Sequence, residues 1–73
     1  MSKSIHSNEY KKVIERLKKA RFESGLKQEE VAIKLKKPQS YISKIEGGER
    51  RIDIAELKEI ANIYGKPISY FIK

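Results

Sequence analysis

Apolar residues recur every three or four positions along most of the chain, which is the period of an amphipathic helix. The longest stripe predicts a first helix over residues 8–24, with an inner face formed by Tyr10, Val13, Ile14, Leu17 and Ala20. Ser7 is placed to cap the start of this helix, and Gly25 is placed to end it in a left-handed conformation.

Two shorter apolar stripes follow and predict helices over residues 28–35 and 39–46. Lys36-Lys37-Pro38 separates them, because the residue before a proline avoids the helical region. Pro38 suits the start of the next helix, and Gly47-Gly48 suits its end. The inward residues of this pair are Val31, Ala32, Leu35, Ile42 and Ile45.

A fourth helix is expected from Asp53, which forms a capping-box pattern with Glu56, to Gly65. Its predicted inner face consists of Ile54, Leu57, Ile60, Ala61 and Tyr64. A short terminal turn after Pro67 carries Ile68, Phe71 and Ile72. The pattern therefore predicts an all-α domain of five short helices over residues 8–73, preceded by a flexible segment over residues 1–7.

Two apolar residues, Ile63 and Tyr70, do not fit these inward faces. They are either ordinary exposed apolar residues or part of a dimer surface built from the fourth helix and the C-terminal turn. We favour the dimer surface.

The charge of the chain favours a polyanion as partner. Its 73 residues include 17 basic and 10 acidic side chains, for a formal charge of +7. DNA, RNA and an anionic membrane surface all fit this charge, as does a merely solubilising role, so charge alone does not choose. RNA is disfavoured because the usual aromatic stacking platforms are missing from the sequence.

Other classes find little support in the sequence. There is no cysteine, so disulfides and thiol chemistry are excluded. No apolar run reaches membrane-spanning length, and the polar N-terminus does not resemble a signal peptide, so we expect a cytoplasmic protein without a membrane partner. The single histidine, His6, has no companion ligands. We expect no metal, no cofactor and no enzymatic activity.

The helix over residues 39–46 has an outer face suited to reading DNA. Two short helices joined by a three- or four-residue turn form the frame of a DNA-binding motif, and Ala32 is small enough to let their backbones cross closely. The outer face is polar, short-chained and nearly free of acid, as insertion into the major groove requires. It consists of Gln39, Ser40, Ser43 and Lys44, with Tyr41 at its edge.

The ordered set Gln28-Glu29-Glu30-Val31-Ala32 and Gln39-Ser40-Tyr41-Ile42-Ser43-Lys44-Ile45-Glu46-Gly47-Gly48-Glu49-Arg50 resembles the lambda-repressor-like helix-turn-helix family, the Cro and phage-repressor or xenobiotic-response-element type. The resemblance covers about residues 10–72. It implies that Gln28 bonds a phosphate and braces the recognition helix. It further implies that Gln39 and Ser40 meet base edges, that Lys44 reaches a base or a phosphate, and that a partly buried ion pair joins Arg21 to Glu46.

At three positions in and beside the motif the sequence departs from the family pattern and has a lysine instead. Lys27 stands where the family usually has a serine or threonine cap, Lys36 where it has glycine, and Lys37 where it has an apolar residue. We expect a positive φ at Lys36 and a phosphate contact at Lys37. Arg50 and Arg51, in the loop after the recognition helix, are interpreted as phosphate contacts, with a solvated loop as the alternative.

Several outer-face residues have two interpretations. Gln39 either bonds adenine N6 and N7 or is solvated, and we favour the base contact. Ser40 and Ser43 bond either a base or a phosphate. Tyr41 either contacts a phosphate or sugar, which we favour, or packs half-buried.

Together these features predict a sequence-specific regulator of transcription that binds double-stranded DNA. The favoured function is a repressor that binds a near-palindromic operator as a homodimer. The alternative is an antitoxin-like protein that binds a partner protein and autoregulates its own promoter.

Overall fold

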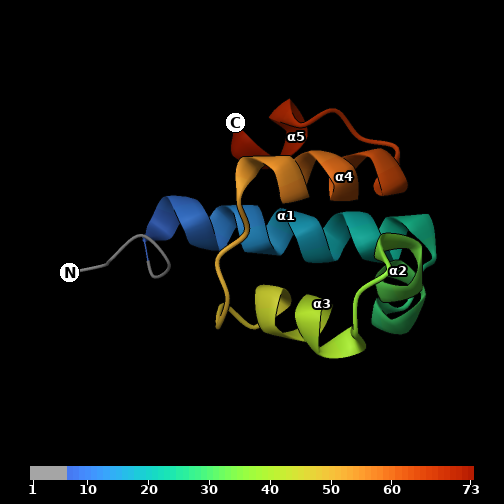
Figure 1. Ribbon diagram of the computed structural model, residues 1–73. Helices are drawn as coiled ribbons and strands as arrows, with labels where there is room; N and C mark the ends of the chain where they lie inside the picture. Colours follow the sequence, from blue (N-terminus) through green and yellow to red (C-terminus); the bar gives the residue numbers. More distant parts are fainter. Residues whose placement is uncertain (1–6) are drawn as a thin grey trace.

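Residues 7–73 are described by the computed structural model, and they form five helices without a β-strand (Figure 1). The all-α fold expected from the apolar pattern is therefore confirmed. Ser7 caps the first helix, whereas the rest of the expected flexible segment, with His6, lies outside the described residues. The helices are α1 (Asn8–Ser24), α2 (Gln28–Leu35), α3 (Gln39–Glu46), α4 (Ile54–Tyr64) and α5 (Ser69–Ile72).

Side-chain caps explain why α1 and α4 begin where they do. The hydroxyl oxygen of Ser7 accepts a hydrogen bond from the Tyr10 amide at 3.1 Å. At α4 the Asp53 carboxylate accepts from the Glu56 amide at 2.8 Å, and the Glu56 carboxylate accepts from the Asp53 amide at 3.0 Å. These bonds satisfy amides that have no partner within the first turn of a helix.

Three helices end in the same left-handed turn. Gly25, Lys36 and Gly65 have φ values of 77°, 59° and 70°. In each turn the following amide donates to a carbonyl five positions back, the pattern of a Schellman motif. The three bonds are Leu26 to Arg21 at 3.3 Å, Lys37 to Ala32 at 2.9 Å and Lys66 to Ala61 at 3.0 Å. Lys36 thus occupies a glycine position, and the positive φ expected there is confirmed.

Replacing Lys36 with glycine is expected to stabilise the protein by about 1 kcal/mol, because a side chain in the left-handed region clashes with its own backbone. Urea unfolding should show a higher midpoint at unchanged slope. Lys34→Gly is the matched control: it removes the same charge from the exposed interior of α2 and should destabilise by about 1 kcal/mol. Equal losses in both variants would contradict the strain at Lys36.

The core lies between α1 and the other helices: α1 packs against α3, α4 and α5, and α2 packs against α3 and α4 (Figure 1). Although α5 has only four residues, its Phe71 is completely buried. The guanidinium of Arg16 on α1 donates to the carbonyls of Tyr70 and Lys73, which caps the end of α5. This short helix is therefore held by one core side chain and one arginine.

Two expectations about apolar residues are wrong. Ile54, placed on the inner face of α4, is 65% exposed. It is the first residue of α4, and helical side chains tilt toward the N-terminus, so this one projects past the end of the helix. Ile63 and Tyr70, expected to point away from the core, are partly buried against it, and the Tyr70 ring meets that of Phe71 edge to face.

Candidate nucleic-acid interface

Helices α2 and α3 pack directly on one another through small and branched residues. Val31 and Ala32 of α2 are buried, as are Ile42 and Ile45 of α3. The turn between the helices runs through Lys36 and Lys37 to Pro38, which is the N-cap of α3 and thus directly precedes its first residue. The side chain of Ala32 is small enough for the close crossing that the motif requires.

The predicted base-contacting residues all lie exposed on α3, in the order Gln39, Ser40, Ser43 and Lys44. No acidic side chain stands in the first turn of α3. Exposed basic residues precede and follow this face along the chain. They are Lys27 at the start of α2, Lys36 and Lys37 in the turn, and Arg51 in the loop after α3. The arrangement presents short polar groups between positive charges, which suits a base-pair edge between two phosphate backbones.

Gln28 braces α3 from the start of α2. Its amide nitrogen donates to the carboxylate of Glu46 at 3.0 Å, and its amide oxygen accepts from the amide of Gln39 at 3.5 Å. One side chain therefore joins the last residue of α3 to the first. The bracing that the family resemblance implied is present, while the phosphate contact of Gln28 stays a prediction.

A buried ion pair anchors this brace to α1. The guanidinium of Arg21 meets the Glu46 carboxylate through two hydrogen bonds of 2.7 Å and 3.0 Å. The two side chains are only 10% and 6% exposed. A third bond runs from Arg21 to the carbonyl of Leu26 at 3.1 Å. The hydrogen bond with Glu46 is the main cause that raises the pKa of Arg21, so this charge is permanent.

Tyr41 lies deeper than expected. Its side chain belongs to the core cluster rather than to the edge of the outer face. Burial, followed by a hydrogen bond with Glu56, raises the pKa of Tyr41 to about 12, so its hydroxyl stays protonated. Lys37 and Arg50 place their charges 5.4 Å and 4.6 Å from the ring centre. Burial favours the packing interpretation of Tyr41 over a contact with phosphate or sugar.

Arg50 is already engaged within the protein. Its guanidinium pairs with both carboxylate oxygens of Glu56, at 3.3 Å and 3.2 Å, and donates to the Arg51 carbonyl at 3.0 Å. Burial alone would raise the pKa of Glu56, but hydrogen bonds from the Asp53 amide and from Arg50 outweigh it and lower that pKa. The neighbouring Arg51 is exposed. Of the two predicted phosphate contacts in this loop, Arg51 is the more available.

Sequence reasoning missed two residues that act on this loop. Glu56 was identified only as half of the α4 cap, and its link to Arg50 has no sequence signature. Tyr10 was assigned to the inner face of α1, yet its hydroxyl contacts the loop backbone about 40 positions further along. No spacing rule connects a tyrosine hydroxyl to distant backbone groups.

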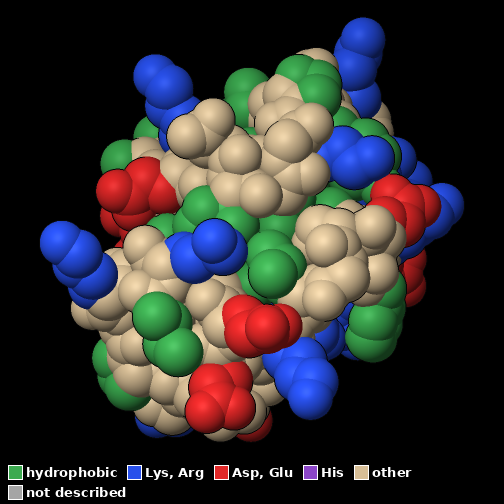
Figure 2. Space-filling view, turned by 90° about the vertical axis from the view of Figure 1, so that its right-hand side faces the viewer, with side chains coloured by type: hydrophobic (Ala, Val, Ile, Leu, Met, Phe, Trp, Pro, Cys, Tyr) green, Lys and Arg blue, Asp and Glu red, His purple; other side chains and the backbone are tan. Residues whose placement is uncertain are grey.

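Figure 2 shows one end of the molecule, where basic and acidic side chains are interspersed rather than gathered into a single patch. Within residues 7–73 no cluster of acidic or histidine side chains is suited to hold a metal ion. No helix in the same range is long and apolar enough to cross a membrane.

An exposed polar face on the second of two short, closely packed helices defines a DNA-binding domain of the helix-turn-helix class. The family model described as "Helix-turn-helix" matches residues 17–71. The chain belongs to this family, of the Cro/C1 and lambda-repressor-like type, and is a DNA-binding regulator. Domains of this kind are not typically enzymes. Neither the curated proteins nor the solved structures contain a significant match to the chain.

Proposed function

We propose that this protein represses transcription by binding a near-palindromic operator as a homodimer. The observation that carries the proposal is the exposed face of α3, whose first residue is braced through Gln28 and Glu46 onto α1. A recognition helix held from both ends enters the major groove with little loss of freedom, which favours specific binding. With a domain this small, covering the promoter and so excluding polymerase is the simplest way to act.

The residues divide into two roles. Those on the outer face of α3 read base edges: Gln39, Ser40, Ser43 and Lys44. Those around the face bond phosphates and set the register of the domain on the duplex: Gln28, Lys37 and Arg51, with Arg50 secondary because Glu56 engages it. Tyr41 supports α3 from within the core.

Binding to fragments of genomic DNA at rising salt concentration tests the function. The affinity should fall steeply and linearly on logarithmic axes, because lysine and arginine displace counterions from phosphates. At fixed salt one set of fragments should bind at least about a thousandfold more tightly than the rest. Affinity that depends on neither salt nor sequence would contradict a role as a DNA-binding repressor.

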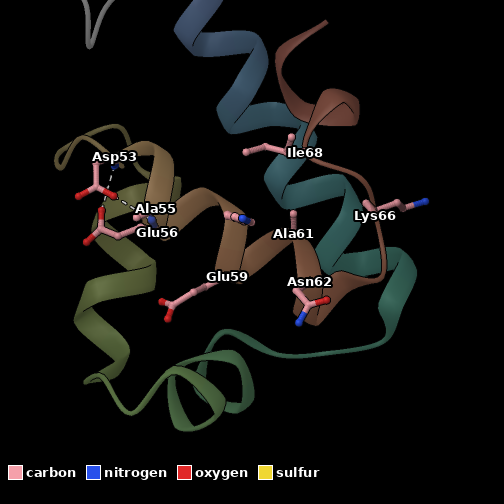
Figure 3. A pocket seen from close by; sticks show the side chains of 9 residues that line it. Asp53, Ala55, Glu56, Glu59, Ala61, Asn62, Lys66 and Ile68 are labelled. Carbon is pink, nitrogen blue, oxygen red and sulfur yellow. Dashed lines mark hydrogen bonds between the residues drawn. The ribbon is translucent and has the colours of Figure 1, made fainter.

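A second copy of this chain is the partner that best fits a groove along α4. The groove, of about 810 Å³, runs along α4 and the segment leading to α5 (Figure 3). Asp53 and Glu56 lie toward one end of it and Lys66 toward the other, and the small side chain of Ala55 also lines it. Across a two-fold axis the groove meets its own copy reversed, so the acidic end of one faces Lys66 of the other.

Replacing Glu59, which lines this groove, with lysine is expected to raise the dimer dissociation constant about tenfold. The change sets a positive charge against the basic end of the partner copy, and the tenfold rise corresponds to about 1.4 kcal/mol of repulsion. Sedimentation equilibrium measures the dimer dissociation constant. Glu15→Lys on the exposed face of α1 is the matched control, because it adds the same charge away from the groove.

Two results would count against this dimer. One is equal weakening by Glu59→Lys and Glu15→Lys, which would mean that net charge rather than the groove matters. The other is a wild-type monomer that co-purifies with the product of a neighbouring gene, which would favour the antitoxin-like function instead.

A further inference from the structure

Tyr10 links the loop between α3 and α4 to α1 through hydrogen bonds. Its hydroxyl accepts a hydrogen bond from the Ile52 amide at 2.9 Å and donates one to the Arg50 carbonyl at 3.4 Å. The hydroxyl thereby uses its donor and an acceptor site on the two residues that flank Arg51. Tyr10 itself is fixed in the first turn of α1, where its amide bonds the Ser7 cap.

Among the described residues the rest of the loop backbone is held at its two ends and by one bond from the Arg50 guanidinium to the Arg51 carbonyl at 3.0 Å. On the α3 side the amides of Glu49 and Arg50 donate to the Lys44 carbonyl at 2.8 Å and 3.2 Å. On the α4 side the Asp53 amide donates to Glu56. Between these anchors, among the described residues, Tyr10 supplies the side-chain bonds to the backbone on either side of Arg51.

We propose that Tyr10 is a positioning residue that holds Arg51 ready to contact a DNA phosphate. This inference rests on the proposed function, in which Arg51 binds the backbone. A phosphate contact from an unrestrained loop loses affinity to the ordering of that loop on binding, and the two hydrogen bonds of Tyr10 impose that order beforehand. Tyr10 precedes residues 17–71, so the family match assigns it nothing.

Tyr10→Phe tests the proposal, because phenylalanine keeps the ring and removes only the hydroxyl. The probes are a duplex selected by the wild-type protein from a random-sequence pool and an unselected duplex of equal length. Affinity for both should fall about fivefold, the effect expected from losing one or two hydrogen bonds. Between about 50 and 200 mM salt the slope of affinity against salt should become shallower by up to about one phosphate contact. The order of preference among sequences should not change.

A double-mutant cycle separates positioning from plain stabilisation. In an Arg51→Ala background, Tyr10→Phe should cause no further loss of DNA affinity, because the side chain that Tyr10 positions is already gone. Tyr64→Phe is the control variant, since Tyr64 is buried in α4 away from the loop; it should leave the salt slope unchanged.

Each outcome is decisive. If Tyr10→Phe lowers only the melting temperature, with unchanged affinity and salt slope, Tyr10 is structural and the proposal is wrong while the proposed function stands. If the two losses add in the double variant, Tyr10 does not act through Arg51, and again the proposal alone fails. If the wild-type protein selects no sequence from the random pool and binds no duplex, both fail together.

Discussion

Glu46→Ala is expected to leave most of the protein unfolded at room temperature. The substitution removes two hydrogen bonds to Arg21 and one to Gln28, and it leaves the guanidinium of Arg21 buried without its carboxylate. Losing one partner of a buried pair costs about 3–5 kcal/mol, which equals the whole stability of about 3–5 kcal/mol expected of so small a domain. Urea unfolding followed by circular dichroism measures the loss.

The matched control is Glu49→Ala, which removes the same charge from an exposed residue three positions further along. It should change stability by less than about 0.5 kcal/mol. Replacing Arg21 and Glu46 together with methionine should recover much of the loss, because the uncompensated charge disappears with its partner. A loss below about 1 kcal/mol for Glu46→Ala would show that the ion pair between Arg21 and Glu46 contributes little to the stability of the fold.

Gln39→Ala is expected to abolish the preference for one base pair of the operator and to lower affinity for the best site by about 1–3 kcal/mol. The reason is that Gln39 is the first residue of the recognition helix and is exposed, and without its 3.5 Å bond to Gln28 the helix is still held through Glu46. Selection from a random-sequence pool, followed by sequencing, measures the preference at every position.

Arg51→Ala serves as the contrast, because a phosphate contact carries no sequence information. It should weaken all duplexes by the same factor and leave the selected sequence unchanged. If Gln39→Ala instead weakened all sites alike, Gln39 would be a support for α3 and not a reader of bases.

The fold was predictable because local chemistry marks where its helices begin and end. Ser7 and Asp53 carry the acceptors that start α1 and α4, and Gly25 and Gly65 supply the left-handed turns that end them. The end of α2 was also predictable, although no glycine stands there. The family pattern has glycine at the position of Lys36, and Lys36 adopts the left-handed conformation of a glycine.

The candidate site was predictable only in part, and the missing part depends on contacts between distant residues. The outward face of α3 follows from helical spacing alone. The engagement of Arg50 by Glu56 depends on how the loop folds back over α4, which no residue pattern encodes. Tyr41 shows the same limit: it has a polar tip, so sequence alone does not say whether the ring or the hydroxyl decides its position.

The brace from α1 to α3 also determines how well the fold tolerates substitutions on the outer face of α3. Helix α3 is held on its inner side by the hydrogen bonds among Arg21, Glu46 and Gln28. The side chains of Ser40, Ser43 and Lys44 are exposed and make no contribution to the core. A library randomised at those three positions and at Gln39 should therefore yield mostly folded members. Target preference and folding are separable in this domain, and it is suited to redirection toward new operators.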